Sequence, residues 1–151
     1  MDLSKLKQNI IKNEGFESKP YLCPNKKLTI GYGRNLENGI TEREAVILLE
    51  NDLLSLKLEL EDKLSVFKNL DDIRQNVILE MAYNMGVPKL LNFKKTIEFL
   101  KKNDFDSASK EMLNSKWHEN FKKYDLQDGK ANNNGLLRSE YLSKVMKEGK
   151  Y

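Results

Sequence analysis

The stretch NEGFESKPYLCPNKKLTIGYG, from Asn13 to Gly33, decides the fold expected for this chain. Before it, apolar residues recur at helical spacing, and Gly15 is placed to end that helix directly after Glu14. Within it, PNKK predicts a turn, and the alternation of apolar residues with threonine and glycine in LTIGYG predicts a strand. The stretch therefore predicts a helix that ends on a carboxylate and leads into a small β-hairpin.

The position of Glu14 has a chemical consequence. A helix C-terminus carries a partial negative charge, which favours the protonated form of a carboxyl group and raises its pKa. A carboxyl group that donates a proton near neutral pH needs such an environment. Position alone nevertheless favours an ordinary solvated glutamate, so the assignment of Glu14 depends on the residues that follow it.

The size and composition of the chain limit its class. It has 151 residues, 39% of them hydrophobic, which suits one domain with a core of its own. No stretch approaches the roughly 18 consecutive apolar residues of a membrane span, and the first residues lack the apolar centre of a signal peptide. We therefore expect a soluble protein without stable membrane insertion.

With one cysteine, Cys23, and one histidine, His118, we expect neither an internal disulfide nor a metal site.

The net charge of +3 is unevenly distributed. Residues 1–36 carry 7 basic and 3 acidic side chains, and residues 89–123 carry 9 and 5, whereas residues 37–88 carry 5 and 11. The basic segments are compatible with a polyanionic partner and equally with ordinary solvated surface. We do not expect nucleic acid as the partner, because no compact Lys/Arg run interleaved with aromatics occurs and no helix-turn-helix or zinc-finger spacing is present.

The rest of the chain has mainly helical patterns. Thr41 and Glu44 form a capping box ahead of leucines spaced three and four apart, which predicts a long helix over about residues 42–66. Shorter helices are predicted after Asp71, in NFKKTIEFL, after Asp104 and in the last amphipathic stretch, GLLRSEYLSKVMKEG. The polar, Asn-rich segment from Lys122 to Gly135 predicts a loop.

These elements predict an α+β fold that is mainly helical. A hairpin lobe of about residues 15–40 is joined by the long helix to a larger helical lobe of about residues 70–151, which also includes residues 1–14. A cleft between two such lobes is where a ligand is expected.

The order of several blocks resembles one known family. Glu14 is followed after eight residues by Cys23, after five more by Thr29, and then by the glycines of the hairpin. The blocks GITEREAVILLENDL, RQNVILEMAYNMG and FDSASKEMLNSKW follow in the same order as in that family. The chain thereby resembles phage-type lysozymes, glycoside hydrolase family 24, over about residues 3–117 and again near Arg138, and this implies a lysozyme-like fold.

The resemblance implies a role for each residue of the Glu14, Cys23 and Thr29 pattern. Glu14 would be the general acid that protonates the glycosidic oxygen, and Thr29 matches the threonine that holds the attacking water. Cys23 stands where many members have aspartate and some have cysteine. A neutral thiol is a poor base, with an unperturbed pKa of ~8.5, so an anionic role requires the thiolate. The alternatives for Cys23 are packing as a small hydrophobe and orienting the water.

Four further positions are expected to bind substrate or support the site. By the resemblance, Arg138 would pair with the catalytic glutamate, and Asn84 matches a polar residue that faces the cleft, although a structural hydrogen bond at a helix junction is an equal alternative. Arg34 stands where a histidine commonly follows the second glycine, and Tyr32 lies between the two glycines. Trp117 is expected in the core, and His118, as a lone histidine, on the surface.

The resemblance implies an endolysin, or muramidase, that hydrolyses the N-acetylmuramic acid to N-acetylglucosamine bond of bacterial peptidoglycan. It implies no cofactor and no metal, and we expect a monomer. The enzyme would stay in the host bacterial cytoplasm until a separate holin-type membrane protein lets it reach the wall in the periplasm. Three alternatives stay open, namely a glycan-binding protein without catalysis, a lytic transglycosylase, and a membrane-active protein that works through its basic C-terminal helix.

Overall fold

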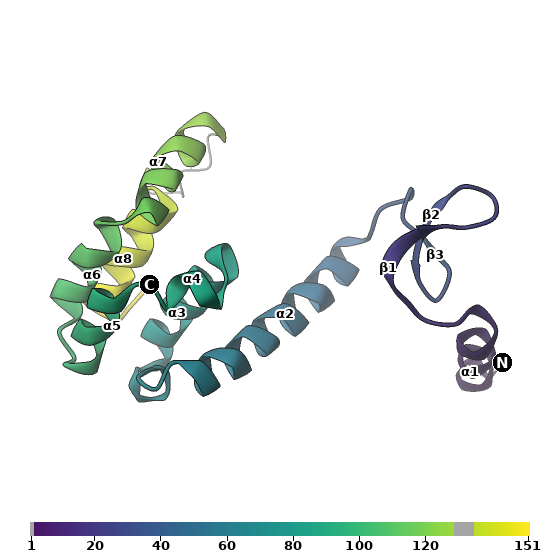
Figure 1. The fold of residues 1–151 in the computed structure, drawn as a ribbon, viewed down its shortest axis with the longest axis horizontal. Coiled ribbons are helices and arrows are strands. Elements are labelled where there is room, and N and C mark those ends of the chain that lie inside the picture. The colour runs from purple at the N-terminus through teal and green to yellow at the C-terminus, as the bar shows by residue number, and fades with distance from the viewer. Residues whose placement is uncertain (1, 129–134) are drawn as a thin grey trace. The chain divides into compact units, whose positions relative to one another are not determined.

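The computed structural model describes residues 2–128 and 135–151. The chain forms two compact units, Met1–Leu49 and Glu50–Tyr151. Within the described residues, the first unit holds the N-terminal helix, a small β-sheet and the beginning of a long helix, and the second consists of helices and their connections (Figure 1). The long helix α2 (Glu42–Lys63) begins in the first unit and ends in the second. The predicted α+β class, with a small N-terminal sheet and a mainly helical remainder, is confirmed.

Helix α1 (Leu3–Glu14) ends where the sequence predicted. Gly15 has a φ of 70°, and its N–H donates to the carbonyl oxygen of Ile11 at 3.2 Å. A left-handed φ directly after a helix suits glycine, because glycine has no Cβ to clash with the neighbouring backbone. Glu14 is therefore the last helical residue, and the chain turns sharply behind it.

The sheet has three antiparallel strands in the order β1 (Glu17–Leu22), β2 (Leu28–Gly31) and β3 (Arg34–Asn35). The predicted PNKK turn is confirmed, since the N–H of Lys26 donates to the carbonyl oxygen of Cys23 at 2.8 Å. Thr29 pairs with Tyr21 on one side and with Asn35 on the other. The hairpin prediction missed β3, because two residues are too few to show an alternation with period two.

Helix α2 begins at the predicted capping box. The carboxylate of Glu44 accepts the N–H of Thr41 at 2.8 Å, and the hydroxyl of Thr41 accepts the N–H of Glu44 at 3.3 Å. The helix ends at Lys63, three residues before the predicted end. Leu64 and Val66 are both buried, and residues two apart point to opposite sides of a helix. The chain leaves the helix so that both can enter the core, and the short 3-10 helix η1 (Phe67–Asn69) follows.

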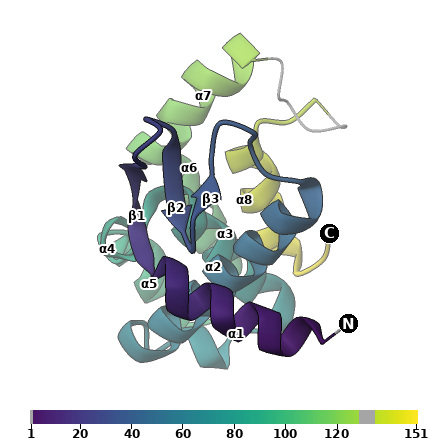
Figure 2. The ribbon, with the colours of Figure 1, turned by 90° about the vertical axis from the view of Figure 1, so that its right-hand side faces the viewer.

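The described helices of the second unit are α3 (Asp72–Met85), α4 (Val87–Leu90), α5 (Lys94–Lys101), α6 (Phe105–Leu113), α7 (Lys116–Asp128) and α8 (Arg138–Glu148). The predicted caps are confirmed, because Asp71 accepts the N–H of Arg74 and Asp104 accepts that of Ser107, each at 3.0 Å. Helix α8 packs against α3, α6 and α7 (Figure 2). Its buried apolar residues, Leu142, Val145 and Met146, belong to the core of this unit.

Helix α7 corrects two predictions. The loop predicted from Lys122 is helical as far as Asp128, while residues 129–134 of that prediction lie outside the described residues. His118, predicted on the surface, is only 6% exposed. Trp117, His118 and Phe121 lie on one face of α7, and this face packs into the core, so the histidine is buried with its aromatic neighbours. The predicted burial of Trp117 is confirmed.

None of the helices in the part of the chain that the structure describes combines the length and the apolar character that a membrane crossing would require.

Candidate functional site

The first unit brings the side chain of Glu14 onto the turn between β2 and β3. A methyl group built on the Cα of Gly33 would lie 2.8 Å from Oε2 of Glu14 and 3.2 Å from its Cδ. Gly33 also has a φ of 74°, which glycine adopts without strain. The carboxyl group of Glu14 therefore occupies space that exists only because residue 33 has no side chain.

Strand β2, which leads into this turn, carries Thr29. The residue is 4% exposed, and its hydroxyl donates to the carbonyl oxygen of Lys27 at 3.0 Å. The same hydroxyl also interacts with the thiol of Cys23. Because a hydroxyl has a single proton, it donates to one of these two acceptors at a time. Thr29 and Cys23 are thus neighbours, while their catalytic roles stay predictions.

The surroundings of Cys23 lower the pKa of its thiol. The largest cause is a hydrogen bond with the backbone of Lys27, and smaller contributions come from the backbone of Asn25, the hydroxyl of Thr29 and the backbone of Cys23 itself. Partial burial of the half-buried thiol acts in the opposite direction. Hydrogen bonds to the charged form favour that form, so the loop increases the fraction of thiolate at a given pH.

Tyr32 lies in the turn itself, next to Gly33. Its ring contacts that of Phe16, with centroids 5.5 Å apart and planes inclined by 48°. Both residues are exposed. The structure therefore places Tyr32 next to Gly33 in the chain and in contact with Phe16, while its supporting role stays a prediction.

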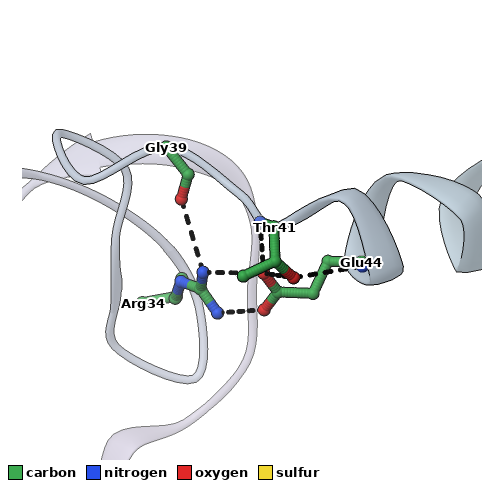
Figure 3. Close-up of polar contacts among 4 residues, drawn as sticks. All are labelled: Arg34, Gly39, Thr41 and Glu44. Carbon is green, nitrogen blue, oxygen red and sulfur yellow. Dashed lines mark hydrogen bonds and ion pairs between the residues drawn. The ribbon is translucent and has the colours of Figure 1, made fainter.

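Arg34, in β3, binds the first turn of α2 (Figure 3). Its guanidinium group donates to both carboxylate oxygens of Glu44, and one nitrogen also donates to the carbonyl oxygen of Gly39 at 3.3 Å. Glu44 in turn accepts the N–H and the hydroxyl of Thr41, each at 2.8 Å. These bonds, led by that of Arg34, lower the pKa of Glu44 to about 2. Arg34, which was predicted as a supporting residue, therefore joins the sheet to the start of α2.

The second unit places Asn84 and Arg138 on the wall of one cavity of about 740 Å³. The rest of the wall consists of three aromatic residues, one methionine, two further asparagines and two lysines. These are Phe93, Trp117, Phe121, Met85, Asn92, Asn120, Lys89 and Lys116. A wall that carries amide groups, cationic side chains and aromatic rings suits a polar ligand with anionic groups. Asn84 also donates to the carbonyl oxygen of Glu80, four residues earlier in α3, at 2.7 Å, and its role in substrate binding stays a prediction.

Arg138 is held at this wall by an aromatic contact. Its Cζ lies 4.4 Å above the centroid of the Phe121 ring, which is a cation–π contact. Its positive charge also acts on Glu80. Partial desolvation raises the pKa of Glu80, although the residue as a whole is exposed, and the charge of Arg138 opposes that rise.

The predicted residues therefore fall into two groups. Glu14, Cys23, Thr29, Tyr32 and Arg34 belong to the first unit, and Asn84 and Arg138 belong to the second. The pairing of Arg138 with Glu14 stays a prediction, as does the inclusion of residues 1–14 in the helical lobe. Within residues 2–128 and 135–151, the structure brings together no cluster of three or more His, Cys, Asp or Glu side chains that could hold a metal ion.

Three residues of the site were not predicted from the sequence to belong to it. Gly33 was read only as part of the hairpin, Glu44 only as a helix cap, and Phe121 was not singled out. A signal existed for Phe121, because Trp117 and Phe121 are four residues apart and so share a helix face. No local signal links Gly33 to Glu14 or Arg34 to Glu44, since these pairs meet only in the folded unit.

This chain belongs to the phage lysozyme family, whose family model matches residues 11–139. Its sequence is similar to two proteins of Dictyostelium discoideum. One is Probable T4-type lysozyme 1, with 38% identity over 82 residues, and the other is Probable T4-type lysozyme 2, with 22% identity over 146 residues. The first alignment covers 52% of this chain and 48% of that relative, about half of each, and the second covers 77% and 86%.

Proposed function

We propose that this protein is a lysozyme-type glycan hydrolase that cleaves the N-acetylmuramic acid to N-acetylglucosamine bond of bacterial peptidoglycan, with Glu14 as the general acid. The observation that carries the proposal is the placement of Glu14 against Gly33, at the end of the strand that bears Thr29 beside Cys23. Membership of the phage lysozyme family supports the same reaction class.

In this mechanism the first unit supplies both the general acid and the groups that hold and activate the attacking water. Glu14 protonates the glycosidic oxygen as the bond breaks. Thr29 holds the attacking water by its hydroxyl, and Cys23, as a thiolate, is the second anionic group in the position where such hydrolases use a carboxylate. Arg138 and Asn84 bind or orient the substrate from the cavity wall of the second unit, and Arg34 and Tyr32 support the turn that holds Glu14.

The decisive experiment compares reducing-end release from purified peptidoglycan by wild type and by Glu14→Gln. The glutamine keeps the shape of the side chain and removes the transferable proton. General acid catalysis contributes typically ~10² to 10⁴-fold, so we expect a loss in that range, and a loss below about tenfold would contradict the role of Glu14. Stability should hold or rise in the variant, because an active-site carboxyl group is often kept at the expense of stability.

The alternatives differ in their products. A glycan-binding protein without catalysis would leave the turbidity of a cell-wall suspension unchanged. A lytic transglycosylase would release anhydro-muramyl ends, which mass spectrometry distinguishes from reducing ends. A membrane-active protein would release dye from anionic vesicles, but α8, the helix considered for that role, has its apolar side chains Leu142, Val145 and Met146 buried in the core.

The biological setting belongs to the same proposal. The protein would act as a monomer, remain in the host bacterial cytoplasm until lysis, and reach the wall through a separate holin-type membrane protein. Expression in bacteria with and without a holin tests this setting. Lysis that requires the holin and Glu14 together is the expected result, and lysis without a holin would contradict the proposed localisation.

A further inference from the structure

The contact between α7 and α8 contains a buried polar pair. Nδ1 of His118 lies 2.8 Å from Oγ of Ser139, and the two residues are 6% and 0% exposed. An imidazole and a hydroxyl need such a partner when they leave water. A hydrogen bond restricts both the distance and the angle between its groups, whereas apolar contacts tolerate small rotations. The pair therefore adds a directional restraint on how α8 is rotated against α7.

Arg138 directly precedes Ser139 and depends on that rotation. Its guanidinium group lies over the ring of Phe121, which is three residues after His118 and so on the same face of α7. Adjacent residues of α8 thus contact neighbouring positions of α7. Arg138 and Ser139 belong to the same helix and move together when it turns. A rotation of α8 large enough to break the His118 contact would therefore also move Arg138 off the Phe121 ring.

The location of Arg138 in α8 does not hold the side chain in place. It is the first residue of the helix, where the helix dipole disfavours a positive charge. Its long side chain also has many rotamers, and holding one of them opposes its conformational entropy. A guanidinium group at the cavity wall therefore needs neighbours that are themselves fixed.

We propose that His118 and Ser139 are positioning residues, which act through Arg138 by holding its guanidinium group on Phe121 at the wall of the 740 Å³ cavity. The effect on activity rests on the proposed glycan hydrolase function. The effect on the position of Arg138 does not, so the two are tested separately.

The first test measures the position of Arg138 by NMR. Because the guanidinium group lies over the Phe121 ring, we expect the ring current to shift the Nε–H resonance of Arg138, and Ser139→Ala should move it toward its value in the unfolded chain. Ser143→Ala is the matched control, because Ser143 is also buried in α8 and donates one hydrogen bond, to the carbonyl oxygen of Ser109 at 2.9 Å. We expect no change in the control. An unmoved resonance in Ser139→Ala would overturn the proposal.

The second test measures kcat/KM on peptidoglycan fragments. Small displacements of a positioned group can cost up to ~10²-fold in rate, and we expect about a tenfold loss in Ser139→Ala and less than about twofold in Ser143→Ala. His118→Phe should behave like Ser139→Ala, while His118→Asn, whose amide can replace Nδ1, should recover part of the activity. If His118→Phe fails to fold, Ser139→Ala decides.

The third test asks whether the effect passes through Arg138. In an Arg138→Met background, Ser139→Ala should reduce kcat/KM no further, because the group that it positions is already gone. Additive losses would overturn the proposal and assign a general structural role to the pair. If Glu14→Gln stays fully active, the proposed function fails, and the NMR experiment still decides the positioning of Arg138.

Discussion

The carboxyl group of Glu14 occupies the space that Gly33 leaves free, with Oε2 2.8 Å from where a Cβ of residue 33 would be. Glu14 is the end of α1, and Gly33 lies in the turn between β2 and β3. The contact thus joins the helix to the sheet inside the first unit. It places the proposed general acid at the end of the strand that carries Thr29.

We expect Gly33→Ala to reduce activity far more than stability. The new methyl group would collide with Glu14 Oε2, and the flexible side chain can relieve the collision by moving the carboxyl group away. The φ of 74° adds roughly 1–2 kcal/mol of backbone strain. Urea unfolding and reducing-end release measure the two effects.

Gly39→Ala is the matched control for Gly33→Ala. Gly39 has a φ of 68°, and nothing lies within 4 Å of the Cβ that it would gain. The strain is therefore similar, but Glu14 is not displaced. We expect a similar loss of stability with most activity kept, and equal losses of activity in the two variants would contradict the role of the Gly33 contact.

Thr29→Ala should lower activity, and Thr29→Ser should keep much of it. Both remove the methyl group, but only alanine removes the hydroxyl that donates to Lys27 and is proposed to hold the water. Loss of this hydrogen bond should also reduce stability by about 1 kcal/mol in Thr29→Ala. Circular dichroism must show that the fold is intact, because strand propensity changes as well. Equal effects of both substitutions would indicate a packing role for the methyl group.

Substitutions of Cys23 distinguish its three possible roles. If the thiolate acts, Cys23→Asp should keep activity, Cys23→Ser should lose most of it, and wild-type activity should fall as the pH is lowered through the thiol pKa. Since the loop lowers that pKa, the fall should occur below the pH at which an ordinary thiol titrates. If Cys23 only packs, serine should be tolerated and aspartate should destabilise the fold.

A role limited to orienting the water gives a third pattern, in which Cys23→Ser is tolerated and activity does not follow thiolate formation. Alkylation supplies an independent check. A wild-type protein that reacts fully with iodoacetamide at Cys23 and keeps its lytic rate would rule out the catalytic thiolate.

The contact between Arg34 and Glu44 should contribute stability that depends on pH. The folded pKa of Glu44 is about 2, below its ordinary value of 4.5, so its contribution is complete above about pH 4.5 and is lost as the pH falls toward 2. Urea unfolding at several pH values should therefore show Glu44→Gln less stable than wild type at neutral pH, with the difference vanishing in acid.

Glu42→Gln controls for the helix dipole in this experiment. Glu42 lies in the same first turn of α2, so its loss tests the effect of a negative charge there without the Arg34 contact. If Glu42→Gln and Glu44→Gln lose the same stability with the same dependence on pH, the contact with Arg34 contributes nothing of its own.

Structural features that depend only on residues close together in the sequence could be predicted. The capping box of Thr41 and Glu44, the cap at Asp71 and the glycine end of α1 were all predicted and confirmed. Each depends on groups within about one helical turn, whose distances follow from the helix itself. The α+β class followed from the same local patterns read in order, and the family resemblance from the order of whole blocks.

The tertiary structure decided which of these residues touch. Glu14 and Gly33, Arg34 and Glu44, and His118 and Ser139 are separated in sequence, and their contacts arise only when turns and helices pack against each other. The same packing buries His118, which sequence reasoning placed on the surface, because burial depends on the helix that covers a face and not on the residue alone. The sequence by itself determined the candidate acid and the elements around it, whereas only long-range packing could set the position of its carboxyl group and of Arg138.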